Sequence, residues 1–181
     1  MRRTSLIQSF KQNFSNPHKT SVQSSVFHQH QTLLDQVCDA YALNLYGAHG
    51  IEHWESVYHN TQRLANAYSI TSDVFIFFAL LHDCKREDED EDFEHGKRAA
   101  FAIKSYQEAG LIPLSPDDQA RLVYACANHT KADKTDPLYQ DLVVQICLDA
   151  DKLDIGRVGI IPEGSHFLTE VGKTIVQSFS K

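Results

Sequence analysis

The chain has 181 residues, enough for one domain with a substantial core, and its 42% hydrophobic and 23% charged residues are ordinary for a globular protein. Its formal net charge of −7 argues against nucleic acid as a partner, and its longest apolar run is too short to span a bilayer. The four cysteines are widely spaced, and the N-terminus lacks the apolar segment of a secretory signal. We therefore expect a cytoplasmic protein with reduced, mostly buried thiols that binds neither DNA, RNA nor a membrane.

The first part of the chain divides into a polar arm and the start of a helical domain. Residues 1–26 are rich in Ser, Gln, Asn and Lys and predict a flexible N-terminal arm, which leaves residues 27–181 as one domain. Apolar residues at helical spacing predict a helix from Gln31 to Tyr46 that Gly47 ends. A second amphipathic stripe runs from Trp54 to Tyr68 and predicts another helix.

A strongly apolar segment, Val74–Leu81, follows the capping residues Thr71-Ser72-Asp73 and leads directly into His82 and Asp83. A buried aspartate is rare unless it is paired or binds a metal. If the segment is a helix, the pair emerges at its C-terminal end, where the helix dipole favours a cation.

The second half of the chain predicts four more helices, and no run alternates as a strand does. The acidic residues 87–92 read most simply as a solvated loop, or else as a lid or a cation-attracting rim. The predicted helices run from Phe93 to Ala109, from Ser115-Pro116 through His129, from Asp136-Pro137 past Asp151, and from Ser165 to Phe179. The sequence thus predicts an all-α fold, a compact single-domain bundle of about seven helices.

Several imidazoles and carboxylates start from apolar helix faces, where a lone histidine is more often a packed core residue than a ligand. They are His53, His82, Asp83, His95, His129 and Asp151. Because they come from different helices, a bundle core can bring them together, and bundle interiors commonly hold metals. Imidazole and carboxylate without thiolate suit Mn, Fe, Co, Ni or Zn in a site that is not structural zinc.

The order of these residues resembles the HD-domain superfamily of metal-dependent phosphohydrolases. The stretches that carry the resemblance are His49-Gly50-Ile51-Glu52-His53-Trp54, Leu80-Leu81-His82-Asp83, Glu94-His95-Gly96, Asn128-His129 and Asp149-Ala150-Asp151-Lys152-Leu153-Asp154 with Ile155-Gly156-Arg157-Val158-Gly159 after it. The last stretch looks like the Asp-Ala-Asp-Arg-Leu-Asp signature of small bacterial HD proteins, with Lys152 in place of Arg. The resemblance covers roughly residues 47–163 and implies an all-α HD-type fold.

The resemblance also implies a metal site. His53, His82, Asp83 and Asp151 would ligate a first divalent ion (Mn, Fe, Co, Ni, Zn or Mg). In family members with two metals, additional histidines bind the second and the aspartate of the dipeptide bridges; His95 and His129 are the matching candidates here.

The expected function is hydrolysis of a small phosphate ester or nucleotide by metal-activated water. Asp83 would orient the water, and Arg86 would stabilise the phosphoryl oxygens. The candidate substrate-binding residues are Lys85, Arg86, Lys152, Arg157 and His49. The chain lacks the Gly-Tyr-Pro signature of cyclic-dinucleotide members and a second domain like that of the long guanosine-tetraphosphate enzymes. The substrate specificity of neither subfamily is therefore assigned to this chain.

Two alternatives share the same residues. HD folds also host di-iron oxygenases, an alternative that depends on His95 and His129 binding a second metal. The other is a non-catalytic module that binds a nucleotide or a partner, with ligand binding that survives Asp83→Ala. A homo-oligomer is compatible with all three functions.

Overall fold

The structure, a computed structural model, describes residues 22–178; residues 1–21 and 179–181 lie outside the described part. Within residues 22–178 the chain forms seven α-helices and no strand, which confirms the predicted all-α class. They are α1 (Gln31–Ala40), α2 (Ile51–Ala67), α3 (Val74–Leu81), α4 (His95–Glu108), α5 (Pro116–Asn128), α6 (Leu142–Leu153) and α7 (Glu170–Gln177). No helix in this part of the chain is long and apolar enough to cross a membrane.

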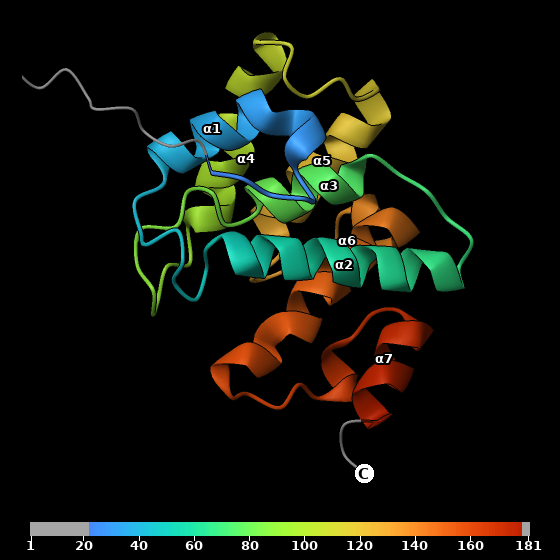
Figure 1. The fold of residues 1–181 in the computed structure, drawn as a ribbon. Helices are drawn as coiled ribbons and strands as arrows, with labels where there is room; N and C mark the ends of the chain where they lie inside the picture. Colours follow the sequence, from blue (N-terminus) through green and yellow to red (C-terminus); the bar gives the residue numbers. More distant parts are fainter. Residues whose placement is uncertain (1–21, 179–181) are drawn as a thin grey trace, which may run out of the picture.

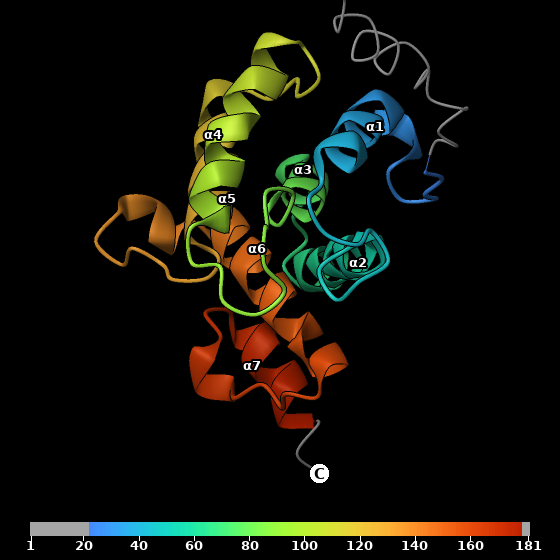
Figure 2. The same ribbon diagram turned by 90° about the vertical axis from the view of Figure 1, so that its left-hand side faces the viewer.

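Helix α3 lies at the centre of the bundle (Figures 1 and 2). Helix α3 begins at Val74, whose amide donates to the Ser72 hydroxyl. Every side chain of α3 except that of Ile76 is buried. Helices α2, α5 and α6 pack around it, and α4 runs beside α5 on the side away from α2 (Figure 2). Because α3 is apolar on all sides, its burial carries His82 and Asp83 into the interior of the bundle.

Helix α1 ends at Ala40, six residues before the predicted end at Tyr46. Tyr41 is extended, its hydroxyl donates to the His49 carbonyl at 2.7 Å, and its ring packs edge-on against Trp54 with centroids 5.2 Å apart. These contacts with the start of α2 turn the chain away from the helix, so apolar spacing beyond Ala40 was a misleading signal.

Two later helix starts also differ from the prediction. Asp136-Pro137 opens only a 3-10 helix, Pro137–Gln140, and α6 begins at Leu142 because the Asp141 carboxylate accepts from the amides of Val143 and Val144. The last helix begins at Glu170 rather than Ser165, because the Thr169 hydroxyl caps it by accepting from the Gly172 amide.

Helices α4 and α5 approach closely at Gly96. A Cβ atom at this position would lie 2.4 Å from the Cys126 carbonyl oxygen and 3.1 Å from Cε1 of His129. Only glycine therefore allows this approach without displacing the α5 backbone. The close contact brings His95, the first residue of α4, against His129 at the end of α5.

The C-terminal segment is attached to α6 through the buried Asp149. The amide of Leu168 donates to Asp149 Oδ1 at 2.9 Å, and the amide and hydroxyl of Thr169 each donate to Oδ2 at 2.7 Å. Gly172 lies against the same carboxylate, since a Cβ there would be 2.8 Å from Oδ2. The carboxylate therefore organises the turn from which α7 starts, below α2 in Figure 1.

Of the predicted arm, residues 1–21 fall outside the described part of the chain. Residues 22–26 contact the domain: Ser24 is buried, and its hydroxyl donates to the Glu55 carboxylate at 2.5 Å. Phe27, at the predicted start of the domain, is fully buried. Three of the four cysteines, Cys84, Cys126 and Cys147, are buried, which confirms the prediction of mostly buried thiols.

Candidate metal centre

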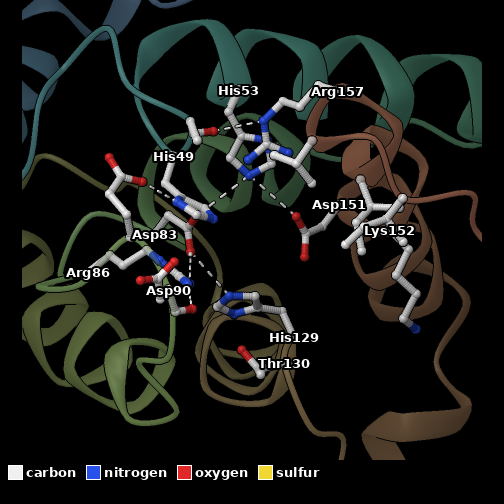
Figure 3. Close-up of a pocket in the computed structure, with 15 residues that line it drawn as sticks. His49, His53, Asp83, Arg86, Asp90, His129, Thr130, Asp151, Lys152 and Arg157 are labelled. Atoms are coloured by element: carbon white, nitrogen blue, oxygen red, sulfur yellow. Dashed lines mark hydrogen bonds and ion pairs between the residues drawn. The ribbon is translucent and has the colours of Figure 1, made fainter.

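The helices bring the six predicted metal-binding residues into one cluster. His53 comes from α2, His82 and Asp83 from the end of α3, His95 from the start of α4, His129 from the end of α5 and Asp151 from α6. All are buried except Asp151, whose side chain is partly exposed. Figure 3 shows His53, Asp83, His129 and Asp151 pointing toward a common space.

A first triad consists of His53, His82 and Asp151, whose donor atoms lie within 4.8 Å of one another. The two Nε2 atoms are 3.0 Å apart, and Asp151 Oδ1 lies 3.4 Å from that of His53 and 3.7 Å from that of His82. Asp83 Oδ2 adds a fourth oxygen, 3.5 Å from His53 Nε2 and 3.7 Å from His82 Nε2.

A second triad consists of Asp83, His95 and His129. Asp83 Oδ1 lies 2.9 Å from His95 Nε2 and 3.4 Å from His129 Nε2, and these two nitrogens are 2.7 Å apart. The two oxygens of Asp83 thus face different triads. Asp83 could therefore contribute one oxygen to an ion at each triad.

Each of the four imidazoles is held by a hydrogen bond through Nδ1. His53 Nδ1 lies 2.6 Å from Asp154 Oδ2, and His82 Nδ1 lies 3.1 Å from the carbonyls of Phe78 and Ala79. The remaining two face backbone carbonyls: His129 faces Cys126 at 2.8 Å, and His95 faces Asp92. Because a carbonyl or carboxylate oxygen can only accept, Nδ1 carries the proton in every ring.

This tautomer leaves the Nε2 lone pairs directed into the cluster. Two lone pairs cannot face each other at 3.0 Å or 2.7 Å without a cation between them, either a proton or a metal ion. Nδ1–H bonded to oxygen with Nε2 facing inward is the arrangement that orients histidine ligands of metals. The residues present therefore fit one or two divalent ions held by imidazole and carboxylate, the donor set of Mn, Fe, Co, Ni or Zn.

The charges of His53, His82 and Asp83 differ because burial and hydrogen bonds act on each of them differently. Burial lowers the pKa of His82 to about 4. Burial also disfavours a charge on His53, but its hydrogen bonds to Asp151 and Asp154 outweigh burial and raise its pKa to about 9. For Asp83 burial opposes ionisation, yet the neighbouring histidines, His82 foremost, hold its pKa well below the usual range. At neutral pH and without metal, His53 is therefore protonated on Nε2, the nitrogen that faces Nε2 of His82.

Metal affinity is expected to rise with pH through the neutral range. Because the pKa of His53 is raised to about 9, the ion must displace a proton at any lower pH, so the association constant gains about tenfold per pH unit up to that value. If the pKa of His53 were the ordinary value of a histidine, the metal affinity would stop rising above about pH 6.5. Titration with Mn²⁺ against a competing chelator from pH 6 to 8.5 measures the slope, and a flat affinity above pH 7 would contradict the prediction.

Asp154 supports His53 from outside the triads, a role that sequence analysis did not assign although this residue lies in the Asp149–Asp154 stretch. Its Oδ1 accepts from the Ser56 hydroxyl, and its Oδ2 lies 3.1 Å from Arg157 Nη1 as well as 2.6 Å from His53 Nδ1. Its position one turn after Asp151 on the same side of the chain was the available signal.

Asp154→Asn is expected to weaken metal binding about 10- to 100-fold while the protein stays folded. The amide keeps the size but removes the charge that fixes the His53 tautomer and raises its pKa. Metal titration checks the affinity, and NMR titration of His53 should show a lower pKa. Ser56→Ala, which removes only the hydroxyl donor to Asp154, should have a smaller effect; equal affinities for both variants and the parent would refute the role.

A pocket of about 740 Å³ opens over the cluster. Its lining includes His53, Asp83, His129 and Asp151 of the two triads, and four of the predicted substrate-binding residues: His49, Arg86, Lys152 and Arg157 (Figure 3). Lys85 is not among the lining residues; its carbonyl accepts from the Arg98 guanidinium instead. The structure thus brings three cations, but not Lys85, to the mouth of the metal cluster.

The acidic segment 87–92 is a loop whose residues 87–91 are exposed, as predicted, and several of its groups contact residues beside the pocket. The Arg86 guanidinium donates to the carbonyls of Asp88 and Asp90 at 2.9 and 3.0 Å, and Asp92 pairs with Arg98. The Glu89 carboxylate lies 2.6 Å from His49 Nδ1. Glu89 and Asp90 also line the pocket, so this exposed loop places two carboxylates at its edge.

No protein-family model matches the chain, and no curated protein matches it. Among solved structures, the chain is similar to the crystal structure of a predicted HD superfamily hydrolase from an uncultured Thermotogales bacterium. The TM-score is 0.62, with 24% identity over 83% of this chain and 84% of that chain. This likeness shows that the chain has the HD-domain fold, which confirms the fold expected from the spaced His and Asp stretches.

Proposed function

We propose that this protein is a metal-dependent phosphohydrolase that acts on a small phosphate ester, with nucleotides as one candidate class. The observation that carries the proposal is the pair of triads joined by Asp83 at the base of a pocket whose walls carry Arg86, Lys152 and Arg157. Carboxylates and imidazoles suit divalent ions, and the cations suit the charge of a phosphoryl group.

A bound divalent ion would lower the pKa of water and offset the negative charge of the phosphate. His53, His82, Asp83 and Asp151 would hold the first ion, with His95, His129 and the second oxygen of Asp83 for another. Because neighbouring histidines keep Asp83 ionised, its carboxylate can accept a hydrogen bond from the attacking water and orient it.

The arginines are positioned before substrate binds. Arg86 uses Nε and one terminal nitrogen on the loop carbonyls, which leaves Nη1 4.0 Å from Asp83 Oδ1 and 3.4 Å from the His95 ring nitrogens. Arg157 is held by the Ala48 carbonyl at 2.7 Å and by Asp154. Guanidinium groups fixed in this way lose little entropy when they bind equatorial phosphoryl oxygens.

Two measurements test the proposal. Elemental analysis of the purified protein gives the metal and its stoichiometry. A panel of phosphate mono- and diesters, assayed with Mn, Co, Ni, Zn or Mg added, should then reveal a substrate whose turnover disappears on chelation. Parent protein that carries metal but hydrolyses no ester of the panel would contradict the proposal, and nucleotide binding without turnover would favour a non-catalytic module.

The second triad supports one other candidate, a di-iron oxygenase, because His95 and His129 lie with Asp83 where a second ion can bind. This candidate predicts iron in the protein as isolated, near two per chain, and oxygen uptake with an organic substrate. Other metals without oxygen uptake would exclude it in favour of hydrolysis.

A further inference from the structure

One side of the pocket over the metal cluster is apolar. Its lining residues are Ile155 and Val158, in the 3-10 helix Asp154–Val158, and Ile160, in the loop that follows this 3-10 helix. Val158 is 46% exposed and Ile160 52% exposed. A ligand that covers these exposed apolar side chains removes them from water, which makes its binding more favourable.

This apolar side is fixed relative to the metal cluster. Arg157, between the apolar residues, donates to the Ala48 carbonyl and pairs with Asp154, which in turn holds His53. Gly159 has a φ of 79°, and this left-handed turn reverses the chain so that residues on either side of it line one pocket. Any ligand anchored at the triads therefore meets the same apolar side chains.

The distribution of positive and negative side chains in the pocket indicates how a phosphate ester would be oriented in it. A phosphoryl group belongs at Asp83, which faces both triads and lies 4.0 Å from Arg86 Nη1, so the rest of the ester must extend along the remaining lining. Glu89 and Asp90, which also line the pocket, disfavour further negative charge on the ligand. The volume of about 740 Å³ accommodates a ligand considerably larger than phosphate alone.

We propose that Ile155, Val158 and Ile160 form a binding subsite for the alcohol part of the substrate, and that this part is uncharged and largely apolar. The inference rests on the proposed function and narrows it: substrates are phosphate monoesters of apolar or aromatic alcohols, in preference to sugar phosphates, glycerol phosphate or polyphosphates.

The test uses binding of n-alkylphosphonates, from methyl- to hexylphosphonate, to the full-length protein loaded with Mn²⁺, followed by calorimetry. Affinity should increase about fourfold per methylene over the first few carbons. Ile160→Ser should weaken hexylphosphonate binding about fivefold and leave methylphosphonate binding unchanged. Ile161→Ser is the matched control, because Ile161 is the same residue type, 75% exposed, and does not line the pocket.

The outcomes separate the subsite from the proposed function. Ester turnover with phosphonate affinity that does not depend on chain length would overturn the subsite alone. Failure of every phosphonate to bind, together with no ester turnover, would overturn both. If Ile160→Ser changes the oligomeric state by size-exclusion chromatography but leaves the chain-length series intact, the apolar side is an interface between copies and the subsite is again refuted.

Discussion

Asp83→Ala is expected to eliminate metal binding at both triads and to reduce any phosphohydrolase activity by at least about 1,000-fold. The two oxygens of Asp83 face different sets of imidazoles, 2.9 Å from His95 Nε2 on one side and 3.5 Å from His53 Nε2 on the other. Removing the carboxylate takes a ligand and a negative charge from both sets at once. Elemental analysis and equilibrium dialysis of the variant measure the loss of metal.

Asp90→Ala is the matched control for this prediction, because Asp90 lines the same pocket but belongs to neither triad. It should bind metal as the parent does. Circular dichroism must show that both variants are helical, so that unfolding is not mistaken for loss of the site. If Asp83→Ala keeps the metal stoichiometry of the parent, the bridging role of Asp83 is wrong.

Asp149→Ala is expected to destabilise the protein by about 2–4 kcal/mol, which lowers the Tm by roughly 5–15 °C for a chain of this size. The carboxylate accepts from the amides of Leu168 and Thr169 and from the Thr169 hydroxyl, and alanine would leave these donors without a partner in a buried turn. Burial raises the pKa of Asp149, so part of the gain from these bonds already offsets its desolvation. Thermal and urea denaturation measure the change.

Asp133→Ala provides the comparison for Asp149. Its carboxylate also accepts from a backbone amide and a hydroxyl, both of Thr135, but at an exposed position where water can replace it. The Tm of this variant should stay close to that of the parent. Similar losses in the two variants would mean that the Asp149 contacts do not organise the start of α7.

Local sequence patterns predicted helices well where one face packs on the core, as in α2, whose bounds Ile51–Ala67 match the stripe closely. They failed where a distant contact ended or delayed a helix. Tyr41 leaves α1 because its hydroxyl and ring are engaged at the start of α2, and the start of α7 depends on Asp149 of α6. Apolar spacing carries no information about such contacts.

The sequence by itself determined the helical class and the six clustered His and Asp residues, because helical periodicity and ionisable residues on apolar helix faces are both visible in the order of residues. Only the tertiary structure decided which atoms face each other. His53 and Asp154, 101 residues apart, meet through the packing of α2 against the end of α6, and this contact sets the tautomer of His53. Likewise, Gly96 lets α4 approach α5, so His95 and His129 can share Asp83. Whether Lys85 or Arg157 reaches the pocket depended on helix packing in the same way, since side-chain direction is fixed only when the helices are assembled.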